Sequence, residues 1–186
     1  MSKMTTKNMV LAAILTAIVI ILQFLGAFIK IGPFSISAVL IPIVIGAATC
    51  GISVGAWLGF VFGVVVLLSG DAALFLAVNV PGTIITVLAK GILCGLGAGL
   101  VFKALSKKNM YLAVILAAIV CPVINTGVFL IGCLLFFMET VTQWAGGTNV
   151  GQYMIVGLVG FNFLIEMAVN IVLSPIVVRL INVRNK

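Results

Sequence analysis

The feature that most constrains this chain is the length of its uncharged apolar runs. Residues 9–28, for example, contain no Asp, Glu, Lys or Arg, and roughly 20 such residues in a helix cross the hydrocarbon core of a bilayer. The runs are continuously apolar, without the alternation of a barrel strand, and therefore predict helices. Because 64% of the 186 residues are hydrophobic and only 7% are charged, the chain cannot cover a water-soluble surface. We therefore expect an all-α membrane protein.

Turn residues and polar segments divide the chain into about six transmembrane helices in one bundle. The expected helices are residues 9–28, 35–49, 53–69, 82–103, 110–137 and 153–181. They form a single transmembrane domain over residues 1–186. The helix at 35–49 is short and contains Pro42, which predicts a kink or an incomplete crossing.

The distribution of cations predicts the orientation, because Lys and Arg favour the cytoplasmic side of short loops. With six spans, three segments on one face hold eight cations: Lys3 and Lys7; Lys103, Lys107 and Lys108; Arg179, Arg184 and Lys186. The other face holds Lys30 with two acids, Asp71 and Glu139. We therefore expect both termini in the cytoplasm. The larger outer segments, 26–34, 70–82 and 138–152, predict a lid over an outward-opening pocket, or else serve only as connectors.

Several polar side chains interrupt the apolar runs and should face the protein interior. Thr83, Thr86 and Lys90 share one helical face, and helix 153–181 repeats a polar residue every four positions from Asn162 to Ser174. With Asn125 and Thr126, these side chains predict a polar cavity for a small ligand. The candidate binding residues are Lys90, Asn125, Asn162, Glu166, Thr86, Asn79 and Asp71. Alternatively, Lys90 and Glu166 pair with each other and join two helices, a reading that can coexist with ligand binding.

Catalysis and several kinds of partner fit this sequence poorly. The chain has no His, and its three acids fall in separate segments, so an acid/base pair is not indicated. The four cysteines lack the close spacing of a metal site, and no nucleotide-binding G-x-x-x-x-G-K-[ST] occurs. The net charge of +7 comes without a basic groove. We expect no catalytic residue, no metal, no cofactor and no nucleic acid.

Small residues recur every fourth position in three of the expected helices. The rows are Ala13 and Ala17; Gly55, Gly59 and Gly63; and Gly91, Gly95 and Gly99. Such rows usually mediate helix contacts inside a bundle. The alanine row, near the cytoplasmic end of the first helix, could instead dock another membrane subunit.

These features together resemble the substrate-specific (S) components of energy-coupling factor (ECF) transporters. The resemblance covers the whole chain and includes the segments Ala13-Ile14-Leu15-Thr16-Ala17, Lys30-Ile31-Gly32-Pro33-Phe34-Ser35 and Ser69-Gly70-Asp71. It implies a bacterial cell-membrane subunit that captures a vitamin from outside under a gating loop between helices 1 and 2. It also implies docking through Ala13 and Ala17 to an energy-coupling transmembrane subunit with two ABC ATPases. The docked subunit would then topple and release its substrate inward.

The sequence resembles the branch that includes the riboflavin and pantothenate proteins. One buried cation among amides and hydroxyls favours pantothenate, a small acid; Asn125 and Asn162 could also serve riboflavin, the next candidate. The alternative function is a stand-alone small oligomeric secondary transporter or channel. A membrane enzyme or assembly factor is less favoured, since the chain has no His.

Overall fold

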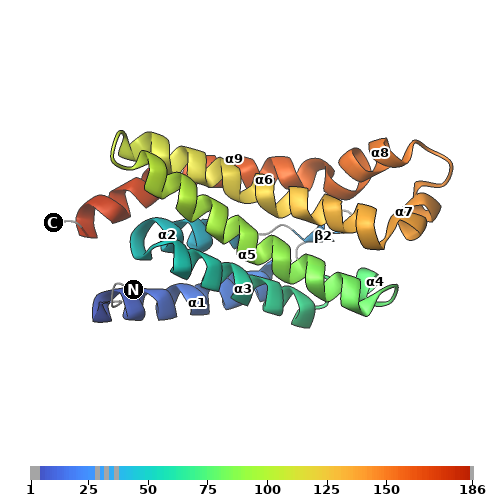
Figure 1. Cartoon of the computed structure of the whole chain (residues 1–186), viewed down its shortest axis with the longest axis horizontal. Coiled ribbons are helices and arrows are strands. Elements are labelled where there is room, and N and C mark those ends of the chain that lie inside the picture. The colour runs from blue at the N-terminus through green and yellow to red at the C-terminus, as the bar shows by residue number, and fades with distance from the viewer. Residues whose placement is uncertain (1–4, 28–29, 32–33, 36–37, 185–186) are drawn as a thin grey trace.

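The computed structural model describes residues 5–27, 30–31, 34–35 and 38–184. Figure 1 shows long helices lying side by side along the longest axis of the molecule. The chain begins with α1 (Thr6–Ala27), followed by strands β1 (Lys30–Ile31) and β2 (Phe34–Ser35), which pair antiparallel. Parts of the expected gating loop, Gly32 and Pro33, lie outside the described residues, as do Lys3 and Lys186.

The middle of the chain forms four helices, and a tight turn joins the first two of them. They are α2 (Leu40–Cys50), α3 (Ile52–Leu68), α4 (Ala73–Leu76) and α5 (Val80–Leu105). The helix expected at 35–49 begins later, at Leu40, because Ser35 pairs within the hairpin instead. Gly51, at φ 104°, joins α2 to α3 in one residue, a conformation that glycine adopts without the Cβ clash of other residues.

The C-terminal half contains α6 (Met110–Phe136), α7 (Met138–Ala145), α8 (Val150–Gln152), the π-helix η1 (Tyr153–Val159) and α9 (Gly160–Arg184). The helix expected at 153–181 is divided into two parts in the structure. The first seven residues are π-helical, and Gly160 then takes a positive φ of 33°. Helical irregularities of this kind occur frequently at functional sites.

Within the described residues, four helices are long and apolar enough to cross a membrane. They are α1, α5, α6 and residues Asn162–Val183 of α9. The helices α2 and α3 are apolar but have only 11 and 17 residues. At 1.5 Å per residue they extend about 16 and 26 Å, less than the roughly 30 Å hydrocarbon core. The six spans and the cytoplasmic position of the termini therefore remain predictions.

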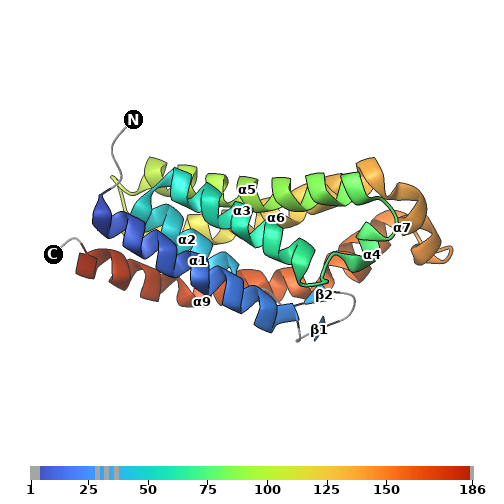
Figure 2. The same ribbon diagram turned by 90° about the horizontal axis from the view of Figure 1, so that it is seen from below.

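The two ends of the bundle differ in their charge and in their connections. In Figures 1 and 2, the start of α1, the α5–α6 connection and the end of α9 lie at one end. We call this the cationic end, because Lys7, Lys103, Lys107 and Lys108 belong to these segments. The hairpin, α4 and α7 lie at the other end, which we call the loop end.

Two glycine rows bring α3 and α5 into backbone contact. A Cβ atom built on Gly91 would lie 2.2 Å from the carbonyl oxygen of Gly59, and one on Gly95 would lie 2.1 Å from that of Gly55. Only glycine permits so close an approach, so the two rows predicted from the sequence are used inside the bundle.

Candidate functional site

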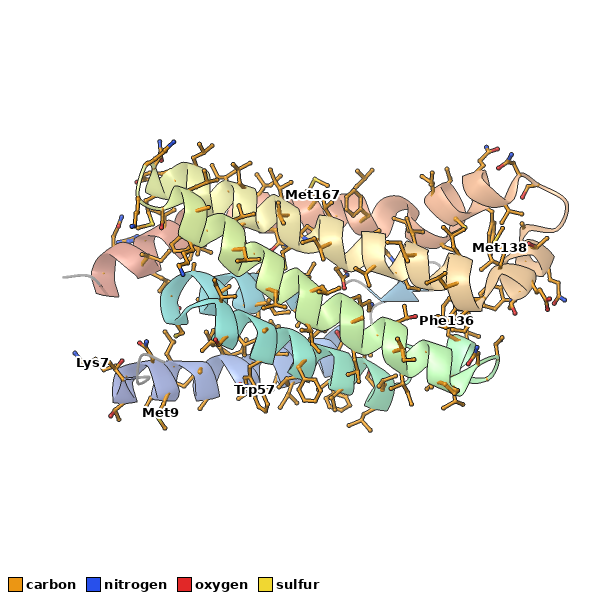
Figure 3. The ribbon with its side chains drawn as sticks, viewed as in Figure 1. Lys7, Met9, Trp57, Phe136, Met138 and Met167 are labelled. Carbon is orange, nitrogen blue, oxygen red and sulfur yellow. The ribbon has the colours of Figure 1, made fainter. Side chains whose placement is uncertain are left out.

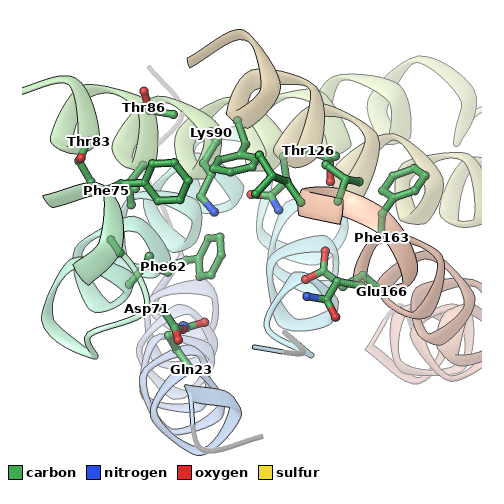
Figure 4. Close-up of a pocket in the computed structure, with 18 of the residues that line it drawn as sticks. Gln23, Phe62, Asp71, Phe75, Thr83, Thr86, Lys90, Thr126, Phe163 and Glu166 are labelled. Carbon is green, nitrogen blue, oxygen red and sulfur yellow. The ribbon is translucent and has the colours of Figure 1, made fainter. Parts of the chain in front are cut away.

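A cavity lies in the half of the bundle nearer the loop end, between helices far apart in the sequence (Figure 4). Its volume is about 110 Å³, whereas a single water needs roughly 10–15 Å³. Its polar wall consists of Gln23, Asp71, Thr83, Thr86, Lys90, Asn125, Thr126, Asn162 and Glu166. Its aromatic wall consists of Phe62, Phe75, Phe129, Phe137 and Phe163. The cavity is therefore large enough for a small molecule that has both polar and apolar parts.

Among the described residues that line this cavity, Lys90 supplies the only cationic side chain. It lies about 15 Å along α5 from Val80 at 1.5 Å per residue. Its Nζ lies 5.4 Å from the ring centroid of Phe62 and 5.8 Å from that of Phe129. A ring face attracts a cation within about 6 Å, so these two rings hold the ammonium group toward the cavity.

Three cavity residues carry buried oxygen atoms that have no hydrogen-bond partner within the part of the chain that the structure describes. They are Thr86 Oγ1, Asn125 Oδ1 and Asn162 Oδ1. Buried polar atoms are nearly always satisfied by protein or by another molecule, because leaving them unpaired costs about 1–3 kcal/mol each. The three atoms come from α5, α6 and α9, so one molecule in the cavity could meet all of them.

The two acidic residues that line the cavity come from opposite parts of the chain. Asp71 follows α3 and accepts a hydrogen bond from the Nε2 of Gln23 on α1, and Glu166 is a buried residue of α9. Figure 4 shows Lys90 and Glu166 directed into the same space. Acid and cation therefore share one cavity.

Gln23 and the aromatic wall were not predicted from the sequence. Gln23 had a recognisable signal, because it is an amide within an otherwise apolar helix, and it is only 2% exposed. The phenylalanines had none, since an apolar pattern does not separate cavity-facing rings from core or lipid-facing ones. Phe75 orders this wall through edge contacts, with ring centroids 5.5 Å from Phe129 and 5.0 Å from Phe137.

The structure brings six of the seven predicted binding residues together and places the seventh elsewhere. Lys90, Asn125, Asn162, Glu166, Thr86 and Asp71 all line the cavity. Asn79 is not among the lining residues. It caps α5 instead, where its Oδ1 accepts a hydrogen bond from the backbone N–H of Gly82 at 2.9 Å.

The polar stripe of α9 is divided in the same way. Asn162 and Glu166 line the cavity, whereas Asn170 and Ser174 are buried beyond it. Asn170 Nδ2 donates to the carbonyl oxygen of Glu166 at 2.8 Å, and Ser174 Oγ donates to that of Ile171 at 2.7 Å. The part of the stripe closer to the cationic end thus bonds to its own helix.

The predicted docking row has a different environment from the glycine rows. Ala13 and Ala17 are both exposed on α1. Beside them, the exposed indole of Trp57 on α3 donates a hydrogen bond to Thr16 Oγ1 at 3.2 Å. Figure 3 shows Met9 and Trp57 directed away from the bundle on this side. The α1–α3 side is thus an apolar outer face, on which the indole N–H of Trp57 is satisfied within the chain.

An apolar helical bundle with a polar and aromatic cavity between its helices defines the class of a small-molecule-binding membrane protein. The family model of the ECF transporter substrate-specific component matches residues 7–178. The chain belongs to this family, as the sequence resemblance predicted. No curated protein and no solved structure matches this chain.

Membership defines the general role of the chain. It is the substrate-binding subunit of an ECF transporter, it resides in a membrane, and it associates with an ECF energy-coupling module. The family consists of transporter components rather than enzymes.

Proposed function

We propose that this chain captures a water-soluble vitamin in the cavity, with pantothenate favoured and riboflavin next. The observation that carries the proposal is the set of unpaired buried oxygen atoms around one cation. Thr86, Asn125 and Asn162 each present such an atom, and Lys90 adds a charge. A ligand with hydroxyl and amide groups and one carboxylate matches this set.

The chemistry of pantothenate fits both walls of the cavity. Its carboxylate is placed against Lys90, where a charge-assisted hydrogen bond is stronger than a neutral one. Its hydroxyl and amide N–H groups are placed against Asn125 and Asn162, whose Oδ1 atoms require donors. Its gem-dimethyl group is placed against the phenylalanines. On this assignment Glu166 accepts from a ligand hydroxyl, and also balances the charge of Lys90.

Riboflavin is the second candidate because five phenylalanines line the cavity. Flat heteroaromatic rings stack well against such side chains. The presence of a cation among the lining residues favours the acidic pantothenate.

The position of the cavity supports uptake from outside. The cavity lies nearer the loop end, and the described Lys and Arg residues of the connections and helix ends, apart from Lys30 in β1, gather at the opposite end. Because Lys and Arg favour cytoplasmic loops, the cationic end is assigned to the cytoplasm, and the cavity is then reached from the exterior. The chain is then a multi-pass protein of the bacterial plasma membrane with six spans, α2 and α3 included.

Docking to the energy-coupling transmembrane subunit, which carries two ABC ATPases, is assigned to Ala13 and Ala17. These residues are exposed, whereas the glycine rows of α3 and α5 already contact each other. Among the small-residue rows, the alanine row therefore remains accessible to a partner helix.

A vitamin-panel binding assay tests the substrate proposal. The purified full chain in detergent is titrated by calorimetry with pantothenate, riboflavin, thiamine, biotin and folate. We expect pantothenate to bind most tightly. Tighter binding of riboflavin would instead support the aromatic wall as the main determinant, and binding of neither would overturn the proposal.

Reconstitution separates the proposed subunit role from a stand-alone transporter or channel. Liposomes that contain the chain alone should bind the vitamin without accumulating it. Addition of the energy-coupling module and ATP should start uptake. Gradient-driven uptake by the chain alone would overturn the coupled mechanism.

A further inference from the structure

A second cavity opens at the cationic end, away from the vitamin cavity. Its volume is about 230 Å³. Its polar side is formed by Thr49, Ser106 and Lys107, and its apolar side includes Phe102, Met110 and Ile181. The lining residues come from α2, α5, α6, α9 and the α5–α6 connection. The cavity is thus built by several helix ends rather than by one surface lysine.

The charge around this second cavity is positive and has no acidic counterpart in the sequence nearby. Lys107 lines the cavity, and Lys103 and Lys108 are exposed in the same stretch of chain. The three acids of the whole sequence are Asp71, Glu139 and Glu166, which belong to the α3–α4 turn, α7 and α9. Asp71 and Glu166 line the other cavity. No acidic side chain of this segment therefore competes with an anionic ligand for Lys107.

We propose that the second cavity binds the phosphate head group of an anionic phospholipid. In this arrangement Lys107 donates to a phosphate oxygen, and the hydroxyl group of Ser106 is a second donor. The proximal acyl chain lies against the apolar side formed by Phe102 and Met110. Basic pockets between the ends of membrane helices are suited to such head groups.

The mixed character of the lining favours a lipid over a free anion. A free phosphate would use the polar side and leave the apolar side in contact with water. A phospholipid satisfies both sides at once, because its phosphate and acyl chain are covalently joined. Lys107 lies in the connection between two helices long enough to cross a membrane, α5 and α6, where lipid head groups are at hand. The inference is independent of the identity of the vitamin.

Native mass spectrometry on the full chain tests the proposal. The chain is incorporated into nanodiscs that contain equal amounts of phosphatidylglycerol and phosphatidylcholine, and the phospholipids that remain bound after release are quantified. Both lipids carry a phosphate diester, but only phosphatidylglycerol has a net charge. We expect wild-type protein to retain phosphatidylglycerol preferentially. Lys107→Ala should reduce that retention about tenfold, as expected for loss of a hydrogen bond to a charged group.

Lys108→Ala is the matched control, because Lys108 is the exposed neighbour and is not among the lining residues. It should reduce retention by at most about fivefold, the effect of one surface cation on anionic lipid. Equal losses in the two variants would overturn the site in favour of general attraction.

Two further arms distinguish the source of the phosphate group and the class of partner. Millimolar inorganic phosphate should leave the retained lipid unchanged, and displacement by it would show that the site accepts the free anion. If Lys107→Ala weakened assembly with the energy-coupling module while lipid retention stayed at the wild-type level, the cavity would be a protein contact and the proposal would be overturned.

Discussion

Replacement of Lys90 by Met tests whether the intramembrane lysine contacts the carboxylate of the vitamin. Met keeps an unbranched side chain of similar length but removes the charge. The ligand is changed in parallel, from pantothenate to pantothenol, in which an alcohol replaces the carboxylate. The two changes form a double-mutant cycle that isolates the contact between the two charged groups.

The expected magnitude follows from the surroundings of Lys90. Unit charges about 4 Å apart interact by about 4 kcal/mol at an effective dielectric constant of about 20. Asp71 and Glu166 line the same cavity and compete for the cation, which lowers the net gain. A charge-assisted hydrogen bond of about 1.5–3 kcal/mol is the appropriate estimate. Wild-type protein should therefore prefer pantothenate over pantothenol by about 10- to 150-fold.

In the Lys90→Met variant this preference should fall to about threefold or less, because no cation remains to distinguish acid from alcohol. The dissociation constants of the four pairs are measured by calorimetry in detergent. Lys103→Met serves as the matched control, since Lys103 is exposed in the last turn of the same helix. Thermal unfolding of both variants separates a binding defect from a folding defect.

A preference that survives in the Lys90→Met variant would refute the reasoning. It would place the carboxylate elsewhere and leave Lys90 with the alternative role, a pair with Glu166 that joins α5 to α9. That pairing role predicts a different pattern, in which the variant unfolds at lower temperature while its selectivity is unchanged.

Two further substitutions test the helix contacts. Gly91→Ala should destabilise the protein by about 1–3 kcal/mol in denaturation assays, because the new Cβ would lie 2.2 Å from the carbonyl oxygen of Gly59; Gly127→Ala, with no atom within 4 Å of its Cβ, is the control and should be tolerated. Ala17→Trp should prevent co-purification with the energy-coupling module while vitamin affinity changes by less than about threefold. Val172→Trp, at a position 72% exposed on α9, should leave both properties intact, and loss of assembly in both variants would argue against a specific docking row.

The polar half of the site could be predicted from the sequence for a physical reason. A charged or amide side chain within an apolar run cannot face lipid at low cost, so Lys90, Asn125 and Glu166 had to point inward. The same argument applied to Asn170, which is buried as expected but bonds to its own helix. The inward orientation of these side chains could be predicted from the sequence. Whether they line the same cavity depends on the rotation and register of their helices, which the sequence pattern does not give.

Asn79 illustrates the limit of the sequence in a different way. It precedes Pro81 and Gly82 at a helix start, and Asn is a preferred N-cap residue. Its amide oxygen accepts from the Gly82 N–H, a local bond that the sequence alone could have indicated. Its position in an outer segment suggested a role in ligand binding, whereas its capping propensity indicates the bond that the structure shows.

Helix ends can be predicted from the sequence best where cap residues or glycines coincide with the end of an apolar run. The helix expected from residue 110 begins at Met110, after the cap residue Asn109. The pattern failed at residues 153–159, because a π-helix and an α-helix present the same apolar composition. The positive φ of Gly160 is a property of the backbone that composition does not encode.

The distribution of apolar contacts explains how a buried cavity can be filled from one side. One core cluster contains most of the buried apolar residues of α1, α2, α3, α5 and α6. At the loop end, a smaller cluster joins Phe75, Cys133, Phe137, Val141, Met154 and Leu158. Three of these residues, Phe75, Phe137 and Leu158, also line the cavity that holds Lys90. Local opening costs least where few apolar contacts are broken, so the smaller cluster beside the cavity is the part of the core that costs less to open.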